Sequence, residues 1–183
     1  MWRKLVITCS ALLAAVGAFV GASRAVGLGN PDLPPGLPAG ALPKANLSDS
    51  ARLDLQNLLG STAEAYGISG GSYENVRVLA QTAAGPLYVV PGRAGLCLAL
   101  VQSTLPAASC GLPSRSDPVV AIFAPDGSAA SLVGGGLTIA GVKGVSVKAP
   151  NGRSARGRAV IGGFAITSAD GFSASDHVDV EAG

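Results

Sequence analysis

The sequence is poor in the side chains that most often carry chemistry. Its 183 residues include one histidine, three cysteines and one methionine, and only 13% are charged. Zinc sites are built from several nitrogen and sulfur ligands, so this composition leaves no ligand set for zinc. Aromatic residues make up 4% of the chain against 48% hydrophobic residues, so we expect a core of aliphatic side chains.

The sequence also lacks a large excess of charge. Its formal net charge is +2, but Arg3, Lys4 and Arg24 contribute three of the thirteen basic residues. From Val26 onward, ten basic residues face all eleven acidic ones, a net charge of about −1. Nucleic-acid-binding domains carry a basic footprint, so this balance argues against nucleic acid as the main partner.

No motif commits the chain to a chemistry. Gly136–Gly141 has the spacing of a phosphate-binding loop, but Val142-Lys143 follow where that loop has lysine and then serine or threonine. We therefore expect a strand and a turn there, and no cofactor.

Gly67–Gly71 matches the G-x-S-x-G pattern of hydrolases, with Ser69 as the nucleophile and His177 as the base. That mechanism needs the serine on a turn from a strand into a helix. Here a helix is expected before Ser69 and strands after it, so we interpret the segment as a connector. An exported serine hydrolase remains the alternative.

The most informative feature present is an apolar run over Leu5–Ser23, which follows Arg3 and Lys4. A positive start, an apolar core and small residues near Ala22 or Ala25 are typical of a signal peptide. As a helix the run would measure roughly 28 Å, which also suffices to span a bilayer. Residues 1–25 are therefore either a cleaved signal peptide or a membrane anchor. Both place the rest of the chain outside the cytoplasm, either extracellular or tethered to the membrane.

The remaining chain divides into three parts. Residues 26–46 hold five prolines among glycine and alanine and are expected to be an extended linker. Residues 47–168 are expected to form a β domain stapled by a disulfide. Residues 169–183 are polar and acidic and are expected to be a flexible tail that binds no metal.

The two cysteines beyond the export segment, Cys97 and Cys110, are expected to form that disulfide, because exported domains pair an even number of cysteines. The chain has no C-x-x-C spacing, and no neighbouring histidine or lysine would lower a thiol pKa. A structural bridge is therefore favoured over a redox site.

Hydrophobic periodicity predicts a mainly β fold, a small antiparallel sandwich or barrel-like domain with one short N-terminal helix. Ser48 and Asp49 are N-cap residue types, and apolar residues recur at helical spacing as far as Thr62, with Gly60 as an interruption. After Val76 the pattern changes to short β-prone runs separated by turn residues. These runs are Val76–Ala80, Leu87–Val90, Leu96–Val101, Val119–Phe123, Ser131–Val133, Leu137–Ala140, Val145–Lys148, Ser154–Ile161 and Phe164–Thr167.

Asn151-Gly152 is the strongest hairpin signal in the chain. In the strand that follows, arginines alternate with small residues, which is the pattern of a strand with one face in water. Both a solvated strand face and a contact surface for an anionic polymer or headgroup are consistent with the basic residues around this hairpin. These are Lys143, Lys148, Arg153, Arg156 and Arg158.

From Arg77 to about Ile166 the chain resembles an uncharacterised group of exported actinobacterial proteins. The resemblance lies in Tyr88–Arg93 leading to Gly95–Leu98, and in the second cysteine within Ala108–Gly111. It continues in Ala140–Val142, Val145–Val147 and the Asn151-Gly152 turn, but Gly162–Phe164 replaces a turn that contains asparagine. The resemblance implies an exported, often tethered β domain with paired cysteines, and it implies no activity.

Together these patterns predict a non-enzymatic binding module of the cell envelope or exterior. Its partner would be an envelope protein or an anionic surface polymer, and only its N-terminal segment would contact the membrane. A subunit that docks to a partner by adding a strand or a helix is the remaining alternative.

Overall fold

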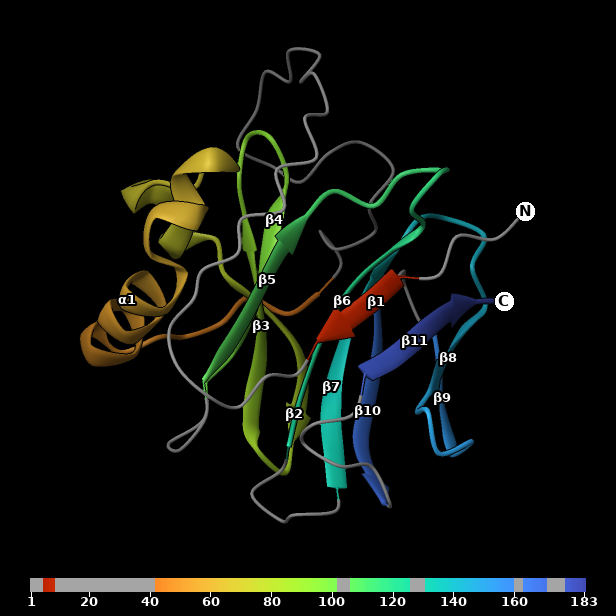
Figure 1. The fold of residues 1–183 in the computed structure, drawn as a ribbon. Coiled ribbons are helices and arrows are strands. Elements are labelled where there is room, and N and C mark those ends of the chain that lie inside the picture. Colours follow the sequence, from red (N-terminus) through yellow and green to blue (C-terminus); the bar gives the residue numbers. More distant parts are fainter. Residues whose placement is uncertain (1–4, 9–41, 102–105, 126–130, 160–162, 171–176) are drawn as a thin grey trace.

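The computed structural model describes residues 5–8, 42–101, 106–125, 131–159, 163–170 and 177–183 (Figure 1). Antiparallel strands dominate this part of the chain, as the sequence predicts, and one long helix precedes most of them. The elements are β1 (Leu5–Thr8), α1 (Asp49–Ala65), the short 3-10 helix η2 (Gly70–Glu74), β2 (Arg77–Thr82), β3 (Gly85–Pro91), β4 (Leu96–Leu100), β5 (Ala107–Gly111), β6 (Val119–Pro125), β7 (Ser131–Thr138), β8 (Gly144–Lys148), β9 (Ser154–Arg158), β10 (Gly163–Asp170) and β11 (His177–Ala182).

The strands form three sheets. The first has the order β2-β3-β4-β5, the second β10-β7-β6 and the third β1-β11-β8-β9. Because β5 lies beside β6 and β10 beside β2, the first two sheets close into a barrel-like sandwich. Helix α1 covers the outer face of the first sheet, and the third sheet lies on the other side of the molecule (Figure 1).

Side chains of β6 alternate between two hydrophobic cores. Val120, Ile122 and Ala124 join the inner core, which lies between the first and second sheets. Val119, Ala121 and Phe123 join the outer core, which lies between the second and third sheets. A strand buried on both faces has a continuous apolar sequence rather than an alternating one, and β6 has that sequence.

Strand β4 is also buried on both faces. Leu96, Leu98 and Leu100 point into the inner core, whereas Cys97 and Ala99 point toward α1. The side chains under α1 form a third cluster, the helix core, which includes Leu55, Leu59, Ala63, Ile68, Tyr73, Val76 and Val90.

Helix α1 begins at the predicted N-cap, and with 17 residues it is longer than the short helix that the sequence predicts. The Ser48 hydroxyl oxygen accepts a hydrogen bond from the backbone N–H of Ala51 at 3.2 Å. At the C-terminus the N–H groups of Gly67 and Ile68 donate to the carbonyls of Glu64 and Ala63, which is the Schellman pattern. Gly67 has a φ of 68°, the left-handed conformation that this cap requires. Gly60 interrupts the helix, with a φ of 48°.

Two glycines of β7 make room for the aromatic rings of the outer core. Gly134 pairs with Phe123 of β6, and Gly136 pairs with Phe164 of β10. A Cβ atom at Gly134 would lie 2.7 Å from the Phe123 ring, and one at Gly136 would lie 2.9 Å from the Phe164 ring. The two ring centroids are 6.4 Å apart. The rings therefore extend over β7 from both sides and cover its backbone.

Strand β7 unites two of the predicted runs: it contains all of Ser131–Val133 and the first half of Leu137–Ala140, and it ends at Thr138. The glycines between them keep their ladder pairs with β6 and β10, so the strand continues where its sequence has no β propensity. Strand β5 was not predicted, because Ala107–Gly111 has small residues and only its pairing with β4 defines it.

The prediction of a flexible tail over residues 169–183 is wrong for its last part. His177–Ala182 forms β11, which pairs antiparallel with β8, and Val180 is only 5% exposed in the outer core. Alternating valines give this short segment an apolar face, and pairing with β8 makes it a strand.

The structure gives only part of the predicted export segment and linker. Leu5–Thr8 is the strand β1 beside β11 rather than the start of a helix, and residues 9–41 lie outside the described part. Pairing with a sheet edge satisfies the backbone groups of a short apolar segment as a helix would. Leu42 already joins the inner core, so the domain begins a few residues before the predicted boundary at 47. Within the described residues, no helix is long and apolar enough to cross a membrane.

We expect Gly136→Ala to destabilise the fold by about 2–3 kcal/mol, the usual cost of overpacking a filled core. The added Cβ would meet the Val120 carbonyl oxygen, which is backbone and cannot move aside as a side chain does. Chemical denaturation measures the effect. Gly71→Ala is the matched control: its Cβ would meet nothing within 4 Å, and it should change stability by less than about 0.5 kcal/mol. Equal stability of the two variants would contradict this account of β7.

Candidate functional site

The hairpin between β8 and β9 carries most of the predicted basic residues, and the structure confirms the hairpin. The N–H of Ala149 donates to the Arg153 carbonyl at 2.9 Å, and the N–H of Gly152 donates to the Ala149 carbonyl at 3.0 Å. Gly152 has a φ of 82°. This is the three-residue loop in which a turn ends on a left-handed glycine. The Asn151 side-chain oxygen also accepts from the N–H of Arg153 at 2.9 Å, which fixes the start of β9.

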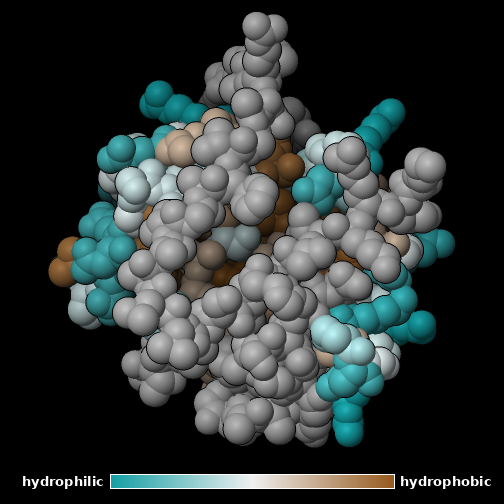
Figure 2. All heavy atoms as spheres, in the orientation of Figure 1, coloured by the Kyte–Doolittle hydropathy of each residue, from teal (hydrophilic) through white to brown (hydrophobic). Residues whose placement is uncertain are grey.

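Strand β9 is the last strand of the third sheet and presents its arginines to water. Arg156 and Arg158 are exposed, whereas Gly157 between them is buried. The ladder places Arg156 opposite Ser146 and Arg158 opposite Gly144 on β8. Directly opposite residues share one face of the sheet, so both arginines project beside neutral neighbours. Figure 2 shows hydrophilic side chains gathered on the side of the molecule where β8 and β9 lie.

The five predicted basic residues have different surroundings in the structure. Arg153, Arg156 and Arg158 lie together on the hairpin, and no ion pair links them to a carboxylate within the described residues. Lys143 precedes β8, and its carbonyl accepts from the N–H of Ala159 just beyond β9. Lys148, by contrast, forms an ion pair with Glu181 of β11, with Nζ and Oε2 2.7 Å apart.

The sequence could not show that an acidic strand lies next to β8. In the register of β11, Asp179 stands opposite Lys148 and Glu181 opposite Ser146. The outward face of the third sheet therefore changes sign across its width. It is basic at β9 and acidic at β11, and β8 lies between them. The basic face is narrower than predicted, and it is centred on β9.

Ser69 and His177 do not come together. Ser69 precedes η2, and its N–H donates to the Ser72 hydroxyl at 3.2 Å. His177 begins β11 in the third sheet. The first and second sheets lie between η2 and β11, since η2 packs in the helix core and β11 in the outer core. Ser69 also follows a helix, α1, whereas the nucleophile turn leads out of a strand.

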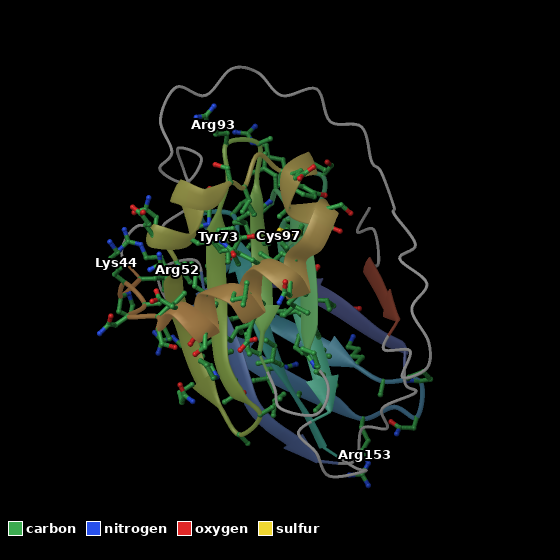
Figure 3. The ribbon with its side chains drawn as sticks, turned by 90° about the vertical axis from the view of Figure 1, so that its left-hand side faces the viewer. Lys44, Arg52, Tyr73, Arg93, Cys97 and Arg153 are labelled. Carbon is green, nitrogen blue, oxygen red and sulfur yellow. A yellow bond between two sulfur atoms is a disulfide. The ribbon has the colours of Figure 1, made fainter. Side chains whose placement is uncertain are left out.

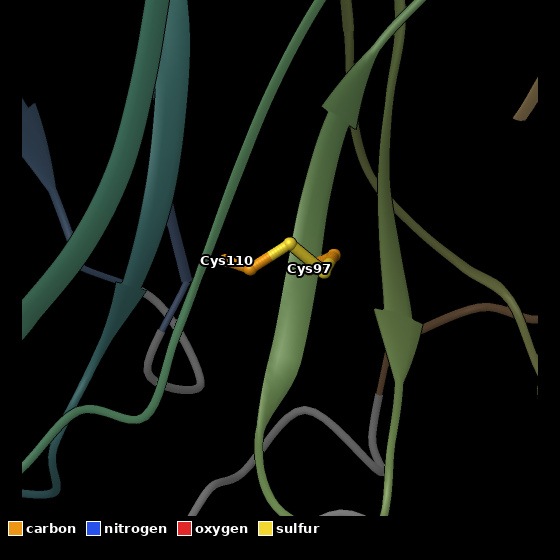
Figure 4. The surroundings of a disulfide bond; sticks show 2 residues. All are labelled: Cys97 and Cys110. Carbon is orange, nitrogen blue, oxygen red and sulfur yellow. A yellow bond between two sulfur atoms is a disulfide. The ribbon is translucent and has the colours of Figure 1, made fainter. Parts of the chain in front are cut away.

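The predicted disulfide is present. Cys97 of β4 and Cys110 of β5 are directly opposite in the ladder, with Cα atoms 4.0 Å apart (Figure 4). Cys97 is fully buried in the helix core, and Cys110 packs against the same cluster. The bridge therefore ties β5 to the interior of the first sheet, under α1. Burial in the same cluster raises the pKa of the Tyr73 phenol above its ordinary value.

The Pro91–Gly95 element, part of the resemblance described above, has a structural role in this chain. It forms the turn between β3 and β4, in which the N–H of Gly92 donates to the Gly95 carbonyl at 2.8 Å. The N–H of Ala94 donates to the Tyr66 carbonyl at 3.0 Å, at the end of α1. A side chain at Gly92 would collide with the Tyr66 carbonyl oxygen. The turn thus satisfies the helix C-terminus, and glycine is required for its close approach.

The described residues also contain no group of side chains that could form a metal site. No set of three or more histidine, cysteine, aspartate or glutamate side chains lies close enough there to hold a metal ion. No known protein family, no curated protein and no solved structure matches this chain.

Loss of the disulfide, in the double variant Cys97→Ala with Cys110→Ala, should cost about 2–4 kcal/mol of unfolding free energy, because the open chain gains conformational freedom when unfolded. Denaturant unfolding of the oxidised protein, with and without reductant, gives the value. Reductant should destabilise the natural chain and leave the double variant unchanged. A natural chain that is insensitive to reductant while its thiols become free would refute a stabilising role.

Proposed function

We propose that this protein is an exported, non-enzymatic β domain of the cell envelope or exterior, and that its β9 arginines bind a surface rich in phosphate groups. The observation that carries the proposal is the placement of Arg153, Arg156 and Arg158. They are exposed on one strand and its turn, and no carboxylate neutralises them in the described part of the chain.

Two features support export. The first is the sequence of residues 1–25, which has the charge, apolar core and small residues of an export segment. The second is the Cys97–Cys110 disulfide, because such bonds persist in oxidising compartments and are rare in the cytosol. A disulfide-bonded chain with an apolar N-terminus fits the outside of a cell.

The chemistry of the arginine face favours ligands that carry phosphate groups over neutral or apolar ligands. Each guanidinium offers a planar fork of donors that matches two phosphate oxygens. Arg156 and Arg158 lie two residues apart on a strand, about 7 Å along it, so they reach successive groups of a repeating polymer. The Ser146 hydroxyl lies opposite Arg156 and adds a neutral donor on the same face. Lys143, near the end of β9, extends the positive charge.

The binding experiment compares vesicles of phosphatidylglycerol, vesicles of phosphatidylcholine and soluble polyphosphate. Near an anionic surface each basic side chain contributes about 1 kcal/mol, or roughly fivefold in affinity. We therefore expect Arg156→Ala with Arg158→Ala to weaken binding to the anionic probes roughly 25-fold. Added salt should weaken the natural chain more steeply than the variant.

Arg93→Ala is the matched control for these substitutions. Arg93 is exposed on the β3–β4 turn, and Figure 3 places it at the opposite end of the molecule from Arg153. We expect this variant to bind as the natural chain does. Arg93→Ala removes one charge instead of two, so a roughly fivefold weakening by this variant would mean that net charge, rather than the β9 face, drives binding. Binding to polyphosphate but not to vesicles would identify a soluble or wall polymer as the ligand, and the reverse would identify a membrane.

The intact mass of the protein from the cell that produces it, measured without reductant, tests export. We expect either a chain that begins at Ser23 or Val26, less two protons, or the full-length chain in the membrane fraction. The first result means a released domain, and the second means a tethered one. A full-length chain with free thiols in the cytosolic fraction would refute export.

A further inference from the structure

Strand β11 has one edge against β8 and the other against β1. The N–H of Gly183 donates to the Gly144 carbonyl at 2.9 Å, and the N–H of Gly144 donates to the Gly183 oxygen at 3.4 Å. Antiparallel strands direct the backbone groups of successive residues to opposite sides. By this alternation Glu181 and Asp179 also face β8, whereas the N–H and C=O groups of Val180 and Val178 face β1.

The segment that covers this edge belongs to the export segment. β1 pairs Leu5 with Val180 and Ile7 with Val178. Leu5–Thr8 also begins the apolar run that, under the proposed function, is either cleaved off or placed in the membrane. In either case these residues are no longer beside β11. The backbone groups of Val178 and Val180 then have no strand partner.

We propose that, once the chain is exported, the edge of β11 that β1 covers accepts a strand from a partner protein, an extended segment in which apolar residues alternate with lysine or arginine. This inference rests on the export part of the proposed function. It assigns the molecule a second interaction surface, separate from the arginines of β9.

The edge has the features of a strand-accepting site. Proteins protect edge strands with proline, lysine or a bulge. His177–Ala182 contains neither proline nor lysine, and its ladders with β1 and β8 show no shift of register. Val180 is buried in the outer core and Ala182 packs against it. An added strand would therefore place its inward residues at the border of an existing apolar core.

The charge of β11 determines which residues suit the outward positions of the partner strand. Asp179 and Glu181 occupy the outward register positions of β11, and in β1 the uncharged Val6 stands opposite Asp179. Opposite charges at facing positions stabilise a pair of strands, and like charges destabilise it. A lysine or arginine at the outward positions of the incoming strand therefore suits this edge better than the sequence of β1 does.

The same charges disfavour a second copy of this chain as the occupant. In an antiparallel self-pairing, valines of one β11 must face valines or Ala182 of the other to keep the apolar residues on one side. The registers that use most of the strand then set Asp179 opposite Asp179 or Glu181 of the second copy. These carboxylates repel each other, so we assign the site to a different, basic strand.

The test uses the processed chain, in the form that the mass measurement identifies, and the blocked peptide Lys-Val-Lys-Val-Lys-Val. Amide hydrogen exchange followed by NMR reports each backbone N–H separately. Without peptide, the amides of Val178 and Val180 should exchange quickly, while that of Val147 in β8 stays protected. Saturating peptide should slow exchange at Val178 and Val180 at least tenfold. The same peptide with N-methylated valines should not, because it lacks donors on its pairing edge.

Charge reversal separates this site from general electrostatic attraction. Glu181→Lys should weaken binding of the lysine peptide roughly fivefold and favour a Glu-Val peptide of the same length. Glu74→Lys is the control, since it makes the same change on η2 and should leave both affinities unchanged. Arg156→Ala with Arg158→Ala should also leave peptide binding intact, so the loss of anion binding and the loss of strand binding are distinguishable.

Three results would overturn the proposal. Slow exchange at Val178 and Val180 in the processed chain without peptide would mean that the edge is already covered. A dimer of the processed chain that saturating peptide does not dissociate, with Val178 and Val180 protected, would assign the edge to a second copy. A peptide effect that is equal for the natural and N-methylated forms would exclude strand pairing. By contrast, a full-length chain with free thiols in the cytosolic fraction refutes export itself and is detected first by its mass.

Discussion

The rings of Phe123 and Phe164 lie over the backbone of β7, where Gly134 and Gly136 leave them room. This contact allows the second sheet to pack closely on the face that it turns to the third sheet, where the outer core lies. The inner core lies on its opposite face, against the first sheet. Interiors are packed as densely as crystals, so larger side chains at the two glycines would separate the layers. The third sheet, which carries both proposed interaction surfaces, is positioned by this packing.

That third sheet separates charge across its width. Arginines occupy β9, Ser146 and Lys148 of β8 follow, and the acidic register positions belong to β11. The ion pair between Lys148 and Glu181 is exposed on both sides and contributes little stability, as such pairs generally do. Its main effect is to remove one positive charge from the basic face. The two proposed interactions rest on this separation, the binding of anions on β9 and the binding of a basic strand on β11.

Much of the fold was predictable because its signals are local. The cap at Ser48, the interruption at Gly60, the Asn151-Gly152 hairpin and the paired cysteines all depend on residues near one another in the sequence. Strands β5 and β11 were not predictable, because small or charged residues become strands there only through pairing with distant segments. The candidate site was predictable only in part, because some of its features are local in the sequence and others depend on which strands become neighbours. The arginines of β9 follow from alternation, but the acidic neighbour of β8 requires the topology.

Under the proposed export, the sheet order also affects when the chain becomes compact as it crosses a membrane. The chain would emerge from its N-terminal end, and the two strands of the β8–β9 hairpin separate β7 from its partner β10. Until residues 163–170 emerge, Gly134–Gly136 have a partner on one side only, and the outer core lacks Phe164. The third sheet must wait still longer, for His177–Ala182. The late segments therefore determine how long the apolar faces of β6 and β7 stay exposed, and a delay in their arrival extends the period in which aggregation competes with folding.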